Sequence, residues 1–226
     1  MHIHFFAKWA SALAATAAFV VWGLLGVATP AAAQVQTAVE YGLWTFQEYV
    51  ISLFVTSSPD EIAALDAAAL NLGVLDTPSG LLWLRTGETF DVWTSPAGGA
   101  LPACRFFYAK EALQRDPGDG EIDVLYLDHL YTPYAAECAS VQANPNWQYE
   151  GIAFYVQVPD ENGNCPIGTT ILYRLYNNGY TGGPSHRLTT SLALFNRYLA
   201  GGWVFEGDGR TFAFACVPSS TTPSMP

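Results

Sequence analysis

One motif occurs three times in this chain. The best-preserved copy is Trp147–Phe154 (WQYEGIAF), and Trp203–Gly207 (WVFEG) repeats its Trp-x-aromatic-Glu-Gly pattern, with Phe212 taking the place of the final phenylalanine after a short insertion. A third copy, Trp83–Phe90 (WLRTGETF), keeps tryptophan, glycine and phenylalanine in register but carries Thr86 where the others have glutamate. Copies spaced about 55 to 65 residues apart predict a repeat architecture in which each unit buries its apolar face against its neighbours.

The first 33 residues have the pattern of a secretory signal peptide. One positive charge, Lys8, precedes an apolar run over Ala10–Val27, and the segment ends in Ala31–Ala33 before Gln34. A membrane anchor would have a similar apolar run, but the small residues at its end favour cleavage. The residue directly after the cleavage site is Gln34 and not a cysteine, which disfavours a lipid-anchored lipoprotein. We therefore expect a secreted or periplasmic protein with no membrane segment after cleavage.

The chain is acidic, with 20 Asp and Glu against 9 Lys and Arg and a formal net charge of −11. Removing residues 1–33 takes away Lys8 and no acidic residue, so the charge becomes −12 over 193 residues (226 − 33). Such a chain repels phosphate backbones, and we expect no nucleic-acid partner. Its length suits a single domain over residues 34–217. We expect repeats at 38–95, 102–158 and 170–217 and a disordered Pro/Ser/Thr-rich tail at 218–226.

Four cysteines, Cys104, Cys138, Cys165 and Cys216, follow the signal peptide. An even number in an exported protein predicts two disulfides. Three pairings are open, and the repeats favour Cys104–Cys138 within the second unit and Cys165–Cys216 bracketing the third. A structural metal site would need closely spaced ligand pairs, which are absent here. We expect neither a metal nor a cofactor.

Each unit has the pattern of a strand, a second strand, a short helix and a strand pair. In the first unit the strands are predicted at Ala38–Trp44 and Tyr49–Thr56, and Ser58–Glu61 (SPDE) starts a helix with a serine cap and a proline at its first position. The pattern predicts a mainly β fold with small helices (α+β), in which three units close around a pseudo-threefold axis, as in a trefoil, and leave no exposed sheet edge. The alternatives are a short solenoid and an irregular α+β sheet.

Three segments carry a family resemblance. Tyr173–Asn177 (YRLYN), His129–Thr132 (HLYT) and Trp147–Phe154 resemble the Y-R-x-Y-N, H-F-Y-T and W-x-Y-E-G-I-A-F signatures of a secreted bacterial repeat family of unknown function. The resemblance covers essentially the whole chain after the signal peptide. It implies export and a repeated module, often appended to hydrolases or wall proteins, for which a lectin-like role has been supposed. The first unit departs from the pattern of these signatures.

Aligning the second and third units leaves a shared set of eight polar residues, called here the polar set. Its members are Arg105 and Arg174, His129 and His186, Thr132 and Thr189, and Glu150 and Glu206. One interpretation is structural, in which arginine pairs with glutamate and the other side chains satisfy buried polar groups. In the first unit Glu40, Ser52 and Thr86 stand at the arginine, histidine and glutamate positions, which weakens any site there.

The other interpretation of the polar set is catalytic. It makes His129 a general base oriented by Asp128, and Glu150 the acid. A catalytic centre normally brings chemically different groups together at one place in the chain. Here the same groups recur in two units. The G-x-S-x-G, H-E-x-x-H and phosphate-loop motifs are absent. We therefore expect no enzyme, and a hydrolase is disfavoured.

Aromatic and amide side chains in the turns are the candidates for ligand contact: Tyr108, Tyr134, Asn177, Asn178 and Tyr180. Tyrosine rings stack on sugars or peptide side chains, and repetition adds avidity. The tryptophans of the repeated motif are expected in the core instead. An acidic insertion at 116–123 could supply calcium ligands, but its spacing does not fit the helix-loop-helix calcium motif, and a solvated loop is favoured. We expect a non-catalytic, lectin-like module that binds glycans or cell-envelope proteins; the alternative is a structural or protein-interaction protein of the envelope.

Overall fold

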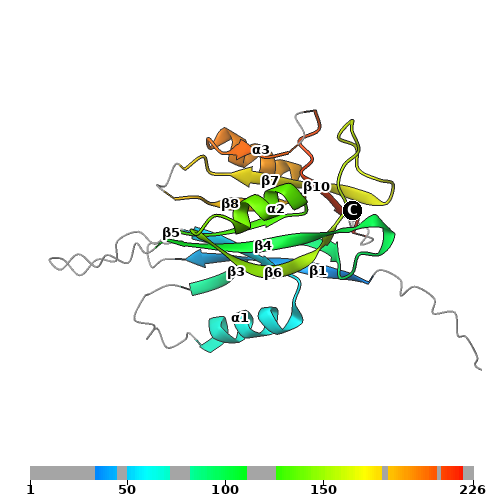
Figure 1. The fold of residues 1–226 in the computed structure, drawn as a ribbon. Helices are drawn as coiled ribbons and strands as arrows, with labels where there is room; N and C mark the ends of the chain where they lie inside the picture. Colours follow the sequence, from blue (N-terminus) through cyan, green and yellow to red (C-terminus); the bar gives the residue numbers. More distant parts are fainter. Residues whose placement is uncertain are drawn as a thin grey trace, which may run out of the picture. The chain divides into compact units, whose positions relative to one another are not determined.

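A computed structural model of the chain describes residues 34–44, 50–71, 82–110, 126–179, 183–207 and 210–220. Four sequence-based expectations lie wholly or partly outside these residues: the signal peptide at 1–33, the acidic loop at 116–123, Tyr180 and most of the tail at 218–226. Within the described residues the fold is mainly β, with three small helices and antiparallel sheets (Figure 1). This agrees with the α+β class predicted from the sequence.

The order strand, strand, helix, strand occurs three times along the described chain. In each case the first strand lies between the other two, because β1 pairs with β2 and β3, β4 with β5 and β6, and β7 with β8 and β9. The elements are β1 Val35–Trp44, β2 Val50–Thr56, α1 Pro59–Asn71, β3 Leu82–Trp93, β4 Leu101–Lys110, β5 Tyr126–Thr132, α2 Ala135–Gln142, β6 Trp147–Val156, β7 Thr169–Tyr176, β8 His186–Thr189, α3 Leu192–Ala200, β9 Val204–Phe205 and β10 Ala215–Pro218, with a short 3-10 turn at Ala97–Gly99.

The three units are not equally distributed between the two sheets. The first two units share one six-stranded sheet in the order β2-β1-β3-β6-β4-β5, and β3 and β6 join through a single residue pair, Trp93 with Tyr155. The third unit forms its own sheet, β10-β7-β8, with β9 also on β7. There β9 and β10 pair with successive parts of β7, so the third strand of this unit is split in two. Trefoil symmetry is therefore not confirmed, because one sheet serves two units and the third is interrupted.

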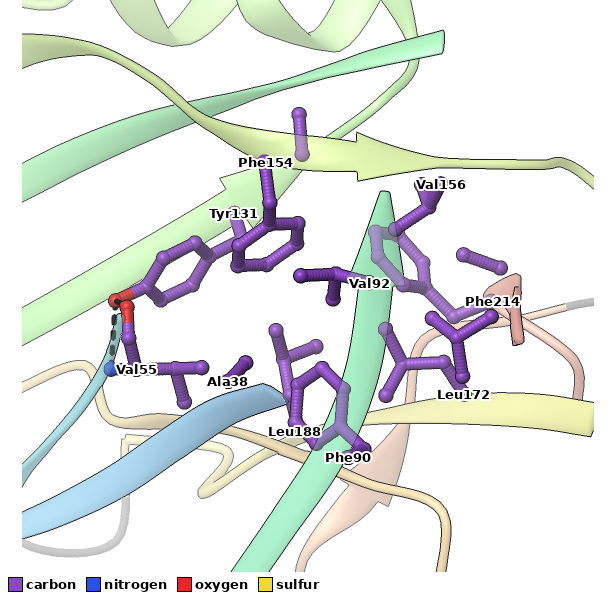
Figure 2. Packing of buried hydrophobic residues seen from close by; sticks show 13 residues of the cluster. Ala38, Val55, Phe90, Val92, Tyr131, Phe154, Val156, Leu172, Leu188 and Phe214 are labelled. Carbon is purple, nitrogen blue, oxygen red and sulfur yellow. Dashed lines mark hydrogen bonds between the residues drawn. The ribbon is translucent and has the colours of Figure 1, made fainter. Parts of the chain in front are cut away.

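The main core draws equivalent residues from all three units (Figure 2). Tyr131 reaches across to the first unit, where its hydroxyl accepts a hydrogen bond from the Val55 N–H and donates one to the Val55 carbonyl, both at 2.8 Å. Buried apolar side chains that exclude water are the dominant stabilising contribution in such a core. The equivalent positions are Ala38, Ala103 and Leu172 on the first strands, Val55, Tyr131 and Leu188 on the second strands, and Phe90, Phe154 and Phe214 from the third segments.

Phe214, not Phe212, occupies the core position of the third unit. The alignment predicted Phe212, but that side chain is 36% exposed whereas Phe214 is 3% exposed. Gly207 lies against the backbone of Phe212, since a Cβ atom on Gly207 would be 2.6 Å from the carbonyl oxygen of Phe212. The insertion therefore takes up more residues than the alignment allowed, and the core position falls two residues later.

Both predicted disulfides are confirmed. Cys104–Cys138 ties α2 to β4, and Cys165–Cys216 ties the loop before β7 to β10. Two of the motif tryptophans lie beside the main core rather than in it: Trp147 packs against a small cluster around Phe106, and Trp203 against one around Phe195. The strand β10 runs through Pro218, one residue past the predicted end of the domain.

Candidate functional site

In the second unit, three neighbouring strands bring Arg105, His129 and Glu150 together. Arg105 lies on β4, in the middle, and its Nε atom is 2.9 Å from a carboxylate oxygen of Glu150 on β6. The same oxygen lies 3.7 Å from Nε2 of His129 on β5. Glu150 is partly buried, which raises its pKa, and the Arg105 guanidinium opposes that shift. The arrangement is an ion pair beside a histidine.

The third unit repeats this geometry. Nε of Arg174 on β7 is 3.0 Å from Oε2 of Glu206, which follows β9, and Nε2 of His186 on β8 is 3.4 Å from the same oxygen. The two threonines of the polar set also have one role in common. Thr132 and Thr189 end their strands, are fully buried, and accept a hydrogen bond from the backbone N–H two residues later. Thr56 of the first unit does the same.

Each arginine also binds a carboxylate from the helix of the preceding unit, which sequence reasoning missed. Glu61 on α1 receives two hydrogen bonds from Arg105, at 2.8 and 3.0 Å. Glu137 on α2 receives two from Arg174, at 2.7 and 3.0 Å. Such two-point contacts are the strongest type of ion pair in proteins. Both glutamates stand five residues after the strand-ending threonine, and this recurrent spacing could have identified them in the sequence.

The first unit reverses the charge at this position. Glu40 replaces the arginine and is fully buried, and its carboxylate accepts a 2.6 Å hydrogen bond from Thr86. The counter-charge comes from Arg187 on β8 of the third unit, whose side chain contacts both Glu40 oxygens at 2.5 and 3.1 Å. Burial raises the pKa of Glu40, and Arg187 opposes the shift. Thr189 also donates to Glu88 of the first unit at 3.2 Å.

These contacts form three inter-unit pairs: Glu61–Arg105, Glu137–Arg174 and Glu40–Arg187. The first joins unit one to unit two, the second joins unit two to unit three, and the third joins unit three back to unit one. The side chains of all three arginines are 13% exposed or less. A buried charge left without its partner is strongly destabilising, so these pairs resist separation of the units.

The catalytic arrangement considered for Asp128 and His129 is wrong. Asp128 is fully buried and binds His186 of the third unit instead, at 2.5 Å from Nδ1 and 2.8 Å from the backbone N–H. Successive residues of a strand point to opposite faces, so Asp128 cannot orient its own neighbour. His129 is buried, and burial lowers its pKa to about 4. It is therefore uncharged at neutral pH.

The candidate contact residues fall in different environments. Asn177 is buried and organises its own turn, donating to the Gly183 carbonyl and accepting from the backbone N–H groups of Gly179 and Ser185. It is not available as a surface contact, because the turn that was expected to display it uses its amide. Tyr108 is half-buried against Trp147, with ring centres 5.2 Å apart. Asn178 is exposed in a left-handed backbone conformation, φ 54°.

Tyr134 lies at a groove of about 480 Å³ beside α2 and the Cys104–Cys138 disulfide. The Tyr134 ring is 38% exposed, and its hydroxyl donates a 2.6 Å hydrogen bond to the carbonyl of Phe214. That bond fixes the ring at the edge of the groove. The volume is in the range of small-molecule pockets, roughly 300 to 1,000 Å³. The groove is lined by Leu101, Pro102, Cys104, Pro133, Tyr134, Ala135, Cys138, Ala139, Gln142 and Val158.

A second cavity lies inside the molecule, between the second strands of the units. Its volume is about 10 Å³, room for about one water molecule. His129, Tyr131, Arg174 and His186 are among its walls. It is too small to receive a substrate, so His129, His186 and Arg174 do not open onto a usable pocket there.

Two further features of the described residues bear on function. Histidine, cysteine and carboxylate side chains do not gather in threes anywhere among them in a way that could hold a metal ion. The helices that the structure defines are all too short or too polar to cross a membrane.

Residues 125–212 match the model of a domain of unknown function (DUF5648). The matched segment runs from the start of β5 to Phe212 and contains every member of the polar set except Arg105. It also contains the three segments that resemble the repeat signatures, together with Tyr134. No curated protein and no solved structure matched the chain. The match thus lies within the second and third units.

Proposed function

We propose that this chain is an exported, non-catalytic module that binds neutral carbohydrate on a cell surface, in the manner of a lectin. Two disulfides support an extracellular or periplasmic location, because such bonds persist in oxidising compartments. The groove beside α2 is the binding site of this proposal. The single observation that carries it is the exposed, tethered ring of Tyr134 at the edge of that groove.

A non-catalytic role is supported by how the polar set is used. Both arginines bind two carboxylates each, and both threonines hold the turns that lead into the helices. The set recurs with nearly the same geometry in two units, which suits a scaffold better than a catalytic centre. A candidate acid or base must also reach a bound substrate, and the cavity beside the two histidines holds about one water.

The inter-unit pairs support a closed arrangement of the repeats. We propose that the three units are arranged around a pseudo-threefold axis, as in a trefoil, with the third unit adapted at its split strand. Each pair links one unit to the next, and Glu40–Arg187 links the last to the first. A solenoid would leave the first and third units apart, so this link favours closure over the solenoid alternative.

The chemistry of the groove favours an uncharged ligand. A tyrosine ring held in one orientation loses little conformational entropy when a sugar ring stacks on it. The ten residues that line the groove carry no ionisable acid or base other than Tyr134. An anionic polymer would gain no charge partner there and would be repelled by the chain's net charge of −11.

Tyr134→Ala is expected to weaken the binding of a neutral oligosaccharide by about tenfold, the loss that corresponds to one aromatic stacking contact of roughly 1 to 1.5 kcal/mol. The ligand would be found on a glycan array with the oxidised protein and then titrated by calorimetry. Tyr134→Phe keeps the ring and should retain most of the affinity.

Tyr149→Ala is the matched control for that experiment. Tyr149 is 41% exposed, belongs to the same unit and lies on β6 outside the groove. It should leave sugar affinity unchanged. Equal losses from Tyr134→Ala and Tyr149→Ala, or an array with no retained glycan, would contradict the proposed site.

A protein-interaction role is the alternative, and one surface favours it. Phe205 and Phe212 are each 36% exposed and pack edge to face, with ring centres 4.7 Å apart. Phe212 adopts a left-handed backbone, φ 62°, which is uncommon and strained for an aromatic residue. Exposed aromatic pairs of this kind are enriched in protein interfaces. A cell-envelope protein captured by the wild type but not by Phe212→Ala would support this role.

A further inference from the structure

The groove that we propose as a carbohydrate site is poor in polar groups. Eight of its ten lining residues are apolar side chains or the two halves of the Cys104–Cys138 disulfide; the exceptions are Tyr134 and Gln142. The Tyr134 hydroxyl already donates to the Phe214 carbonyl. The groove can therefore offer few hydrogen bonds to a ligand.

Because the groove has so few polar groups, a plain hexose cannot be its best ligand. Such a sugar carries hydroxyl groups around its whole ring, and each hydroxyl removed from water without a partner costs free energy. A sugar that suits the groove must turn an apolar group toward Leu101, Val158 and the disulfide. One polar group of that sugar, next to the apolar group, must also lie within reach of the Gln142 side chain.

Gln142 is well placed for one polar contact. It is the last residue of α2 and is exposed, and its side-chain amide has no hydrogen-bond partner among the residues that the structure describes. An amide offers one acceptor and two donors, so it pairs naturally with another amide. An acetamido group has the same donor and acceptor, and it ends in a methyl group that the apolar wall can bury.

We infer that the groove is a subsite for an N-acetylated hexosamine, with the sugar ring against Tyr134, the acetamido methyl group against the apolar wall and its amide on Gln142. This inference rests on the proposed carbohydrate-binding function and narrows it to one class of sugar. Burying one methyl group and pairing one amide both favour this sugar over its hydroxyl counterpart.

The test compares two trisaccharides that differ only at carbon 2. N,N′,N″-Triacetylchitotriose, called chitotriose below, carries acetamido groups there and cellotriose carries hydroxyl groups, and each would be titrated into the oxidised protein by calorimetry. Chitotriose is expected to bind at least about tenfold more tightly than cellotriose. Gln142→Ala should cost chitotriose about fivefold, the effect of one neutral hydrogen bond, and should leave cellotriose unchanged. Gln142 is exposed at a helix end, so this variant should fold normally.

The outcomes separate this inference from the proposed function. Preference for chitotriose that Gln142→Ala reduces supports both. Equal binding of the two trisaccharides, or preference for cellotriose, overturns the inference and leaves the carbohydrate-binding function standing. Tighter binding of a rhamnose oligosaccharide, which has a methyl group but no amide, would also overturn it. Failure of all three sugars, together with an empty glycan array, overturns both.

Discussion

Glu40→Gln is expected to lower the free energy of unfolding by about 3 to 5 kcal/mol, the cost of removing one partner from a buried ion pair. Glu40 is fully buried and the Arg187 side chain is 7% exposed. Glutamine keeps the shape of the side chain and the contact with Thr86 but removes the charge. The Arg187 guanidinium would then remain buried with no carboxylate to neutralise it. Urea unfolding at neutral pH, followed by circular dichroism, measures the change.

Two variants show whether the lost charge is the cause. Glu40→Gln combined with Arg187→Met removes both charges and should recover part of the loss, because a buried pair can often be replaced by apolar side chains. Arg85→Gln removes an exposed ion pair with Asp66, which solvent already screens, and its effect should be far smaller. If Glu40→Gln and Arg85→Gln have the same effect, the Glu40–Arg187 pair does not join the first and third units.

Phe214→Ala is expected to cost about 3 to 5 kcal/mol of unfolding free energy, the usual effect of cutting back a buried phenylalanine. Phe214 is 3% exposed in the main core, and the Arg174 guanidinium lies 4.1 Å above its ring centre. Removing the ring therefore leaves a cavity between units and removes the aromatic contact on one face of the buried Arg174 guanidinium. Thermal or urea unfolding gives the difference from the wild type.

Phe212→Ala provides the comparison. The two residues are of one type and lie two positions apart, but Phe212 is 36% exposed and contributes less buried surface. Its replacement should cost much less than that of Phe214. The reverse order would mean that Phe212, which the alignment of the repeated motif put in the place of Phe154, is the true core equivalent.

Contacts within a unit could be predicted from the sequence, because they follow from aligning the copies. The two disulfides and the approach of Arg105 to Glu150 were both expected on that basis. The strand and helix order of each unit was also expected. Local hydrophobic pattern and turn residues determine such features, and both are visible in one sequence.

Contacts between units could not be predicted in the same way. Asp128 pairs with His186, 58 positions away, and Glu40 with Arg187, 147 positions away. Alignment compares equivalent positions and carries no information on which non-equivalent positions meet. The sharing of one sheet by two units depends on a single residue pair between β3 and β6. No periodicity encodes that junction.

The groove also escaped prediction, although Tyr134 was among the candidates. Its walls come from the start of β4, from α2 with the two residues before it, and from Val158 beyond β6; the Cys104–Cys138 disulfide joins the first two. A cavity is a property of the assembled surface, and residues such as Leu101 and Gln142 carry no signal of their own. For Asn177 the reverse holds. It was expected to be an exposed contact residue because it lies in a polar turn, but the turn itself buries its amide.

The central claim is that the polar set holds the fold together. Urea unfolding of Glu150→Gln tests it most directly, because Glu150 was also the candidate catalytic acid. The variant should lose about 1 to 3 kcal/mol, the cost of leaving the buried Arg105 Nε atom without its charged neighbour, and not more, because Arg105 keeps its two bonds to Glu61. A Glu150→Gln protein that unfolds at the wild-type urea concentration would contradict the claim and return Glu150 to the candidate catalytic residues.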